Sequence, residues 1–88
     1  MYLGSVVGTV VSTTKNEGLI GTKLLLVKQL NEKLEVVGNT HVVVDSVGAG
    51  VGETVIVATG SSARKIFSSD SPIDCAIVGI VDSIEVNN

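Results

Sequence analysis

The stretch DSVGAGVGETVIV, residues 45–57, is the part of the chain that most resembles a site for chemistry. Three alternate glycines follow a run of valines, and glycine-rich turns of this kind can cradle a nucleotide phosphate. Such a loop needs a helix after its last glycine, whereas ETVIV predicts a strand. The spacing G-x-G-x-G also departs from the dinucleotide motif, and Asp45 and Glu53 place negative charge at both ends. We therefore expect a strand-to-strand turn with positive φ angles, or a close approach of backbone, instead of a nucleotide site.

Other reactive side chains are isolated in the sequence. His41 is the lone histidine and Cys75 the lone cysteine, so the chain has neither a disulfide nor a four-ligand zinc set. Nothing basic flanks Cys75 to lower its pKa, and we expect an inert thiol. The run SSAR, residues 61–64, could form an anion site at a helix start, but a helix cap with a salt bridge or interface bond from Arg64 is the simpler interpretation. We expect no catalytic residue, metal or cofactor.

The length of 88 residues predicts one domain over 1–88. So small a domain buries a modest fraction of its surface and is marginally stable by itself. Apolar residues form 44% of the chain and the mean hydropathy is +0.51, so part of the surface is expected to be apolar. With disulfides and zinc excluded, oligomerisation is the expected source of added stability.

The charge balance bears on partners. A net charge of −3 and a pI near 4.8 make nucleic acid or an anionic membrane a poor partner. We see no signal peptide and no apolar run long enough to span a membrane, and a single cysteine fits the reducing cytoplasm.

Valine-rich runs bounded by turn residues predict an all-β chain. The expected strands cover residues 5–13, 22–30, 34–37, 40–47, 53–60 and 73–86, with bends at Gly8 and Gly79. Residues 15–21 are predicted to be a loop, and residues 61–67 the one short helix. Five to six short strands favour a small Greek-key barrel of the oligonucleotide-binding type, which leaves no long exposed sheet edge.

Three blocks of the sequence resemble one family. GTVVSTTKNEGLIGTKLLLVKQL (8–30) contains Thr-x-Lys and Leu-x-Gly-x-Lys-Leu-Leu, and DSVGAGVGETVIVATGSSAR (45–64) contains Val-Gly-Ala-Gly and Gly-Ser-Ser-Ala-Arg. IDCAIVGIVDSIEV (73–86) contains Val-Gly-Ile-Val-Asp. In these blocks the chain resembles the EutN/CcmL family, the pentameric vertex proteins of bacterial microcompartment shells.

The resemblance implies a structural role in the cytoplasm, without catalysis. Five copies would form a ring at the corners of a polyhedral shell whose other tiles are hexameric proteins. We expect the small residues Gly48, Ala49 and Gly50 near the fivefold axis, bounding a narrow opening, with Arg64 bonded to Glu53 or Asp45 of a neighbouring subunit. The residues expected at the subunit interface are Lys15, Asp45, Glu53, Ser61, Ser62 and Arg64. An alternative function is a small barrel that binds single-stranded nucleic acid or a small ligand, although the aromatics are few.

Overall fold

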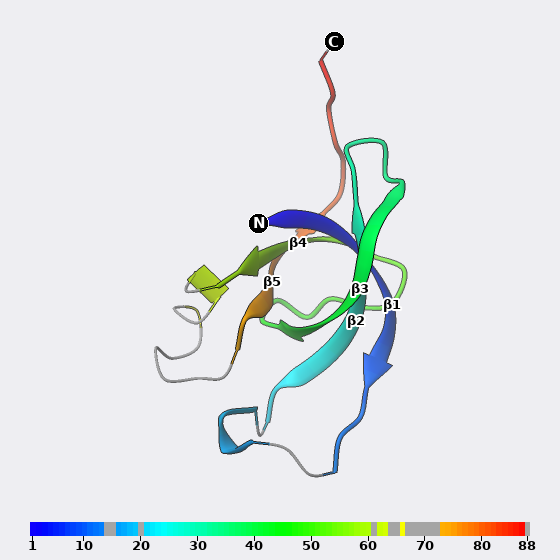
Figure 1. Cartoon of the computed structure of the whole chain (residues 1–88). Helices are drawn as coiled ribbons and strands as arrows, with labels where there is room; N and C mark the ends of the chain where they lie inside the picture. Colours follow the sequence, from blue (N-terminus) through cyan, green and yellow to red (C-terminus); the bar gives the residue numbers. More distant parts are fainter. Residues whose placement is uncertain (14–15, 20, 61, 64–65, 67–72, 88) are drawn as a thin grey trace.

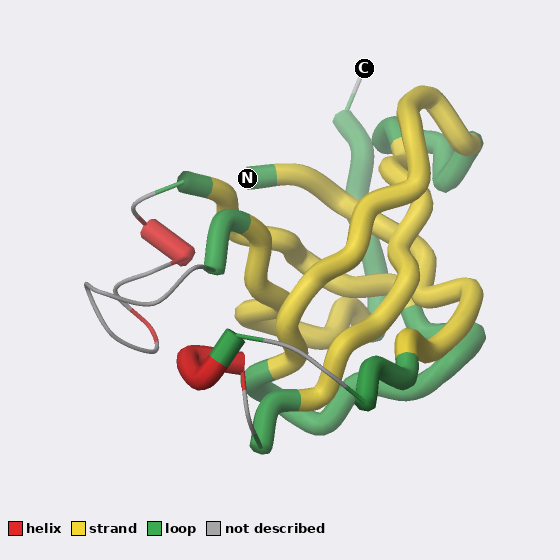
Figure 2. Tube along the Cα trace, turned by 60° about the horizontal axis from the view of Figure 1, so that its bottom comes forward, coloured by secondary structure: helices red, strands yellow, loops and turns green. Residues whose placement is uncertain are grey.

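The computed structural model describes residues 1–13, 16–19, 21–60, 62–63, 66 and 73–87. Five strands close into a barrel in the order β1-β2-β3-β5-β4. Figure 1 labels the strands, and Figure 2 shows them curving around one another in a second view. All neighbouring strands are antiparallel except β3 and β5, which run parallel over two residue pairs. This Greek-key order confirms the predicted all-β barrel. The elements are β1 Tyr2–Val10, η1 Glu17–Leu19, β2 Lys23–Leu30, β3 Val36–Asp45, β4 Thr54–Thr59 and β5 Cys75–Val81.

The barrel interior is filled by side chains from every strand. Because successive side chains of a strand point to opposite faces, alternate residues of each strand face inward. Branched aliphatic residues dominate this core, and Ala49 of the loop between β3 and β4 joins them although it belongs to no strand. The cluster consists of Val6, Leu25, Val27, Val43, Ala49, Val55, Val57 and Ile77, each at most 1% exposed.

A second, smaller apolar cluster lies beside the short parallel contact. Val44 and Ala76, which are register partners on β3 and β5, pack there with Ala63 and Ile73. Leu19 of η1 and Leu24 of β2 are partly buried and pack against the cluster. Val44 and Ala76 each stand next in sequence to a residue of the main cluster, so they point to the opposite face of the sheet. This cluster therefore covers the outside of the seam between β3 and β5.

Several predicted strand boundaries were wrong because pairing partners set them. The first strand begins at Tyr2 instead of residue 5, since residues 2–5 pair with β4, and it ends at Val10 near the start of β2. The predicted strands 34–37 and 40–47 are one strand, β3, whose irregular pairing with β2 absorbs the glycine and asparagine between them. The last strand ends at Val81 instead of residue 86, because its partner on β4, Thr54, is where that strand begins.

Smaller features follow the sequence more closely. The bend expected at Gly8 is a register shift between Val6 and Gly8. Near Gly79 the pairing of β4 with β5 also shifts, between Ile56 and Val57. The segment 15–21 contains the single turn η1, where only a loop was expected. In the expected helix, Ser62, Ala63 and Ile66 are helical, and residues 61, 64, 65 and 67 lie outside the described residues.

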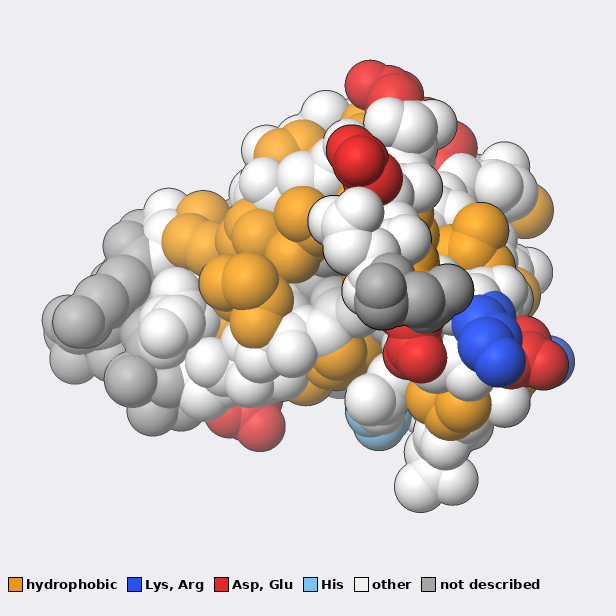
Figure 3. All heavy atoms as spheres, turned by 90° about the horizontal axis from the view of Figure 1, so that it is seen from above, with side chains coloured by type: hydrophobic (Ala, Val, Ile, Leu, Met, Phe, Trp, Pro, Cys, Tyr) orange, Lys and Arg blue, Asp and Glu red, His pale blue; other side chains and the backbone are white. Residues whose placement is uncertain are grey.

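Apolar side chains remain on the surface, as the high hydropathy predicted. Figure 3 shows hydrophobic side chains gathered on the face seen from above. Large apolar residues more than half exposed occur on the β2–β3 hairpin, in the loops after β1 and β3, and near both chain ends: Met1, Val11, Leu34, Val36, Val37, Val42, Val51 and Val86. Among the described residues, no helix has the length and apolar character needed to cross a membrane.

Candidate functional site

The glycine loop, residues 46–53, joins the end of β3 to the start of β4. A strand therefore precedes and follows it, as the sequence predicted. Gly48 has φ +80° and Gly52 has φ +94°, which are left-handed conformations that favour glycine. The predicted turn with positive φ angles is thus confirmed at two of its three glycines. Gly50 does not share this conformation.

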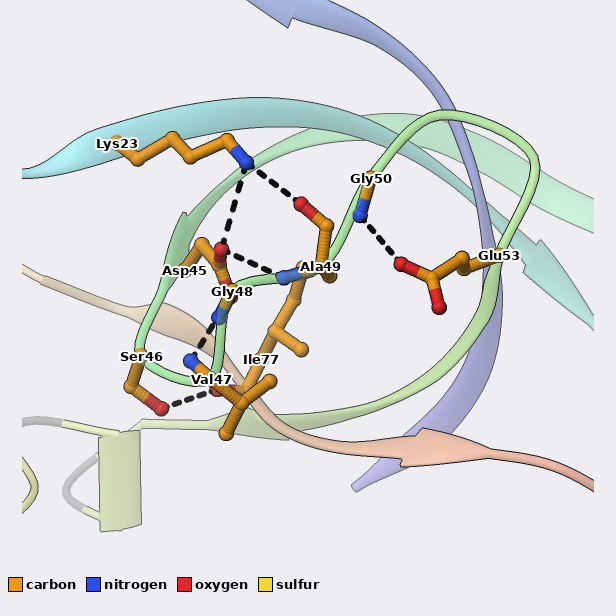
Figure 4. Close-up of polar contacts among 9 residues, drawn as sticks. All are labelled: Lys23, Asp45, Ser46, Val47, Gly48, Ala49, Gly50, Glu53 and Ile77. Carbon is orange, nitrogen blue, oxygen red and sulfur yellow. Dashed lines mark hydrogen bonds and ion pairs between the residues drawn. The ribbon is translucent and has the colours of Figure 1, made fainter.

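Asp45 holds the first half of the glycine loop (Figure 4). Its Oδ1 accepts hydrogen bonds from the backbone N–H groups of Val47 at 3.0 Å and Gly48 at 3.2 Å, and its Oδ2 accepts from Ala49 at 2.8 Å. The side chain of Asp45 is 2% exposed. A buried carboxylate needs such donors, because burial without them is costly. The carboxylate is therefore an integral part of the turn.

Lys23 adds a cation to the same network. In the β2–β3 register Lys23 is opposite Asp45, and its Nζ lies 3.8 Å from Oδ2 of that carboxylate. The same ammonium group donates to the carbonyl oxygen of Ala49 at 2.6 Å. Because half of the Lys23 side chain is exposed, its contribution is smaller than that of the backbone donors. Lys23 ties β2 to the glycine loop.

Glu53 holds the second half of the loop. Its Oε1 accepts a hydrogen bond from the N–H of Gly50 at 2.7 Å, and the N–H of Glu53 donates to the carbonyl of Gly50 at 3.2 Å. The loop is also joined to β1, since Val6 donates to the carbonyl of Glu53 and accepts from the N–H of Gly52. The turn is anchored at both ends by bonds within the chain.

The glycine loop therefore does cradle an anion, but the anion belongs to the chain itself. Four consecutive backbone N–H groups, those of residues 47–50, point to the carboxylates of Asp45 and Glu53. A phosphate would have to displace these carboxylates and would meet their negative charge. The sequence resembles a phosphate loop because both kinds of loop turn several backbone N–H groups toward one anion. Here those N–H groups already donate to carboxylates of the same chain.

Ala49, one of the three small residues of the glycine loop, packs inside the barrel. Its side chain is fully buried in the main core cluster, while Gly48 is exposed and Gly50 half-buried. Small size at Ala49 is needed to fit the barrel interior, independent of any subunit contact. The position of Gly48, Ala49 and Gly50 near a fivefold axis stays a prediction.

The predicted interface residues divide into three groups. Asp45 and Glu53 lie at the two ends of the glycine loop with the contacts described above. Ser62 is exposed on the helical segment. Lys15, Ser61 and Arg64 lie outside the described residues. The predicted bond between Arg64 and a neighbouring carboxylate therefore stays a prediction.

A polar contact that sequence reasoning missed joins Tyr2 and His41. The Tyr2 hydroxyl lies 2.8 Å from Nδ1 of His41, and the two rings meet edge to face at a centroid distance of 5.5 Å. Burial, with a smaller effect from Cys75, raises the pKa of Tyr2 to about 12. The hydroxyl is therefore protonated at neutral pH and suited to donate to an unprotonated Nδ1. Only the tertiary fold brings β1 and β3 together here, so no local pattern could have predicted this pair.

Cys75 has the character expected of an inert thiol. Burial, together with the nearby negative charge of Asp74, raises the pKa of its thiol. A raised pKa leaves little thiolate at neutral pH, and thiolate is the nucleophilic form. Within the described part of the chain, no three His, Cys, Asp or Glu side chains are grouped so that they could hold a metal ion.

Comparison with known proteins gives a consistent result. The sequence model described as ethanolamine utilisation protein EutN/carboxysome matches residues 1–82. The shell vertex protein GrpN of Rhodospirillum rubrum is 64% identical over 89 residues, covering both chains completely, and the vertex protein PduN of Salmonella typhimurium is 51% identical, covering 96% of this chain and 98% of PduN.

Solved structures agree with these sequence matches. The structure described as the GrpN pentameric microcompartment shell protein from Rhodospirillum rubrum superposes with a TM-score of 0.92, covering 99% of this chain and all of that one at 64% identity. The Gloeobacter violaceus CcmL structure has a TM-score of 0.92 at 38% identity, covering all of this chain and 92% of that one. Family model, sequence identity and fold agree along almost the whole length. The chain therefore belongs to the EutN/CcmL family.

Proposed function

We propose that this chain forms a homopentamer that closes the vertices of a polyhedral bacterial microcompartment in the cytoplasm. The observation that carries the proposal is the 64% identity, over the full length of both chains, to a protein named as a microcompartment shell vertex protein. The matching structure is described as a pentameric shell protein. The whole chain acts as one EutN/CcmL-type domain, and its role is structural, without catalysis.

The physical properties of the subunit suit a ring. A fivefold ring joins two different surfaces of neighbouring subunits, because a rotation of this kind cannot pair a patch with itself. Several valines are exposed on the isolated barrel, and contact between subunits would remove some of them from water. Association in this way would stabilise a domain whose own core is small.

Within the ring, we place the glycine loop near the fivefold axis and the residues around it at the subunit interface. Gly48 is exposed and has no side chain, which suits the close approach of five copies. Of the two candidate partners for Arg64, Glu53 is the better one, because Asp45 is almost fully buried and already accepts three backbone N–H bonds. The proposed interface residues are Lys15, Asp45, Glu53, Ser61, Ser62 and Arg64.

The partners of the ring are hexameric shell proteins. A closed polyhedron cannot be made from hexagonal tiles alone, and pentagonal units supply the missing curvature at its corners. We expect neither nucleic acid nor membrane to be a partner, since the chain is acidic.

Co-expression tests the proposal. Hexameric shell proteins from the same organism would be produced with and without this chain, and the assemblies compared by electron microscopy. We expect closed polyhedra when the chain is present, and open sheets, tubes or shells with vacant corners when it is absent. Identical assemblies in both samples, with the chain not incorporated, would refute the proposed function.

A further inference from the structure

A groove opens where β3 and β5 separate. Among the described residues these strands are paired only from Val44 to Asp45 on β3 and from Ala76 to Ile77 on β5, and no pairing joins them before those residues. The space between them has a volume of about 430 Å³. It is lined by Leu19, Leu24, Thr40, His41, Val42, Val44, Ile73, Asp74 and Cys75.

The described lining of the groove is mostly apolar and almost uncharged. Leucine, isoleucine and valine side chains dominate it, and Asp74 is its only carboxylate among those residues. Val42 is 54% exposed, so the isolated barrel leaves apolar surface in the groove open to water. Before Val44, β3 pairs only with β2 among the described residues, so one edge of the strand borders the groove.

The second half of β1 has complementary properties. Register pairing of β1 with β4 ends at Ser5, and among the described residues 8–10 pair only with β2. Val7 lies at the register shift between Val6 and Gly8. Val7 is 42% exposed, and Val11, just beyond the strand, is 90% exposed. No other large hydrophobic side chain among the described residues is as exposed as Val11. Residues 2–13 contain no charged side chain.

We infer that residues 7–11 of one copy dock in the β3–β5 groove of a second copy, with Val11 as the anchor. The inference rests on the proposed ring, in which each subunit must meet its neighbours through two different surfaces. The structure described as a pentamer, at 64% identity, makes a second copy the natural occupant. An uncharged segment enters this groove without the cost of burying a charge.

Other exposed apolar segments fit the groove less well. Leu34, Val36 and Val37 on the β2–β3 hairpin lie among charged residues, at positions 32, 33 and 35. The C-terminal residues Ile84 and Val86 flank Glu85. Docking either segment would bring charges to an apolar lining. Residues 83–88 also lie beyond the part of the chain that the family model matches.

Cross-linking provides the direct test, because the groove contains a native thiol. Val11→Cys would be combined with Cys75 and treated with a short bis-maleimide at mildly alkaline pH, since burial raises the pKa of the Cys75 thiol. Each subunit would be linked to the next, giving a covalent ladder up to five chains on a denaturing gel. The ladder should disappear in Val11→Cys/Cys75→Ser. Val86→Cys, also an exposed valine, should give no ladder.

Charge substitution gives a second, independent test. Val11→Asp should weaken assembly at each interface by about tenfold or more, because burying a valine side chain contributes at least one factor of ten in affinity. Val86→Asp is the matched control and should leave assembly unchanged. Native mass spectrometry across a dilution series measures both variants.

The two experiments distinguish a failure of the proposed docking from a failure of the proposed pentamer. A ladder in Val11→Cys, with assembly lost in Val11→Asp only, supports the docking. A wild-type pentamer whose Val11→Cys variant gives no ladder, or stops at dimers, overturns the docking and leaves the ring intact. A wild-type chain that stays monomeric at every concentration overturns both.

Discussion

Replacing Asp45 by alanine should destabilise the subunit by about 2.5–5 kcal/mol, which we derive from the contacts of its carboxylate. The N–H of Ala49 is in a buried residue and loses its acceptor outright, at a cost of about 1.5–3 kcal/mol. The N–H groups of Val47 and Gly48 belong to exposed residues, so water replaces the carboxylate and each loss costs only about 0.5 kcal/mol. The half-exposed Lys23 adds about 0–1 kcal/mol.

The assay is urea unfolding followed by far-ultraviolet circular dichroism, at one fixed protomer concentration because association shifts apparent stability. Glu53→Gln is the matched control. An amide oxygen can still accept the single bond from Gly50, so its loss should be below about 1 kcal/mol. Asp45→Asn should fall between the two, since its amide keeps an acceptor but turns a donor toward another N–H.

The refuting result is specific. If Asp45→Ala lost less than about 1 kcal/mol, the carboxylate would not be holding the loop, and the in-chain anion would not explain the glycine-rich sequence. The N–H groups of Val47, Gly48 and Ala49 would then again be possible donors to a ligand, whereas the N–H of Gly50 would still be bonded to Glu53. A small domain has only about 5–10 kcal/mol of stability in total, so the expected loss is easily measured.

Three further predictions follow from the barrel. Gly4→Ala should destabilise by about 1–3 kcal/mol in urea unfolding, because the added Cβ would collide with Cγ1 of the fully buried Val27; Gly8→Ala, where the Cβ meets only ordinary contacts, should cost under about 1 kcal/mol. Gly48→Ala should cost about 1 kcal/mol through its φ of +80° alone, since nothing lies near the added carbon, and a loss of zero in thermal unfolding would show that the loop relaxes freely. Tyr2 keeps its proton in the folded chain up to a pKa of about 12 but loses it near 10 when unfolded, so its contribution is complete below pH 10 and falls between pH 10 and 12. Tyr2→Phe should lose less stability than the native chain across that interval, and parallel pH profiles would contradict this.

Much of the fold could be predicted because the apolar runs in the sequence coincide with the strands that pair in the closed barrel. The strands at residues 23–30 and 54–59 were placed within one residue at each end, since both have clear apolar runs between turn residues. Other boundaries depend on partners far along the chain. Val81 ends β5 because Thr54 begins β4, and no signal around residue 81 records that fact.

The site could be predicted only in part, because several of its contacts depend on the three-dimensional fold and leave no local signal in the sequence. The sequence predicts that the acidic residues flanking the glycines disfavour phosphate, but their hydrogen bonds to four loop N–H groups emerged only from the three-dimensional turn. The burial of Ala49 was likewise invisible, since an alanine between glycines reads as loop surface. Tyr2 and His41 are 39 positions apart and meet only when the barrel closes.

Native mass spectrometry of the purified chain at micromolar concentration tests the central claim most directly. A vertex protein should give one dominant species with five times the 9.0 kDa mass of the chain, and dilution should dissociate it without other closed rings. A stable monomer, dimer or six-membered ring under these conditions would contradict a vertex role.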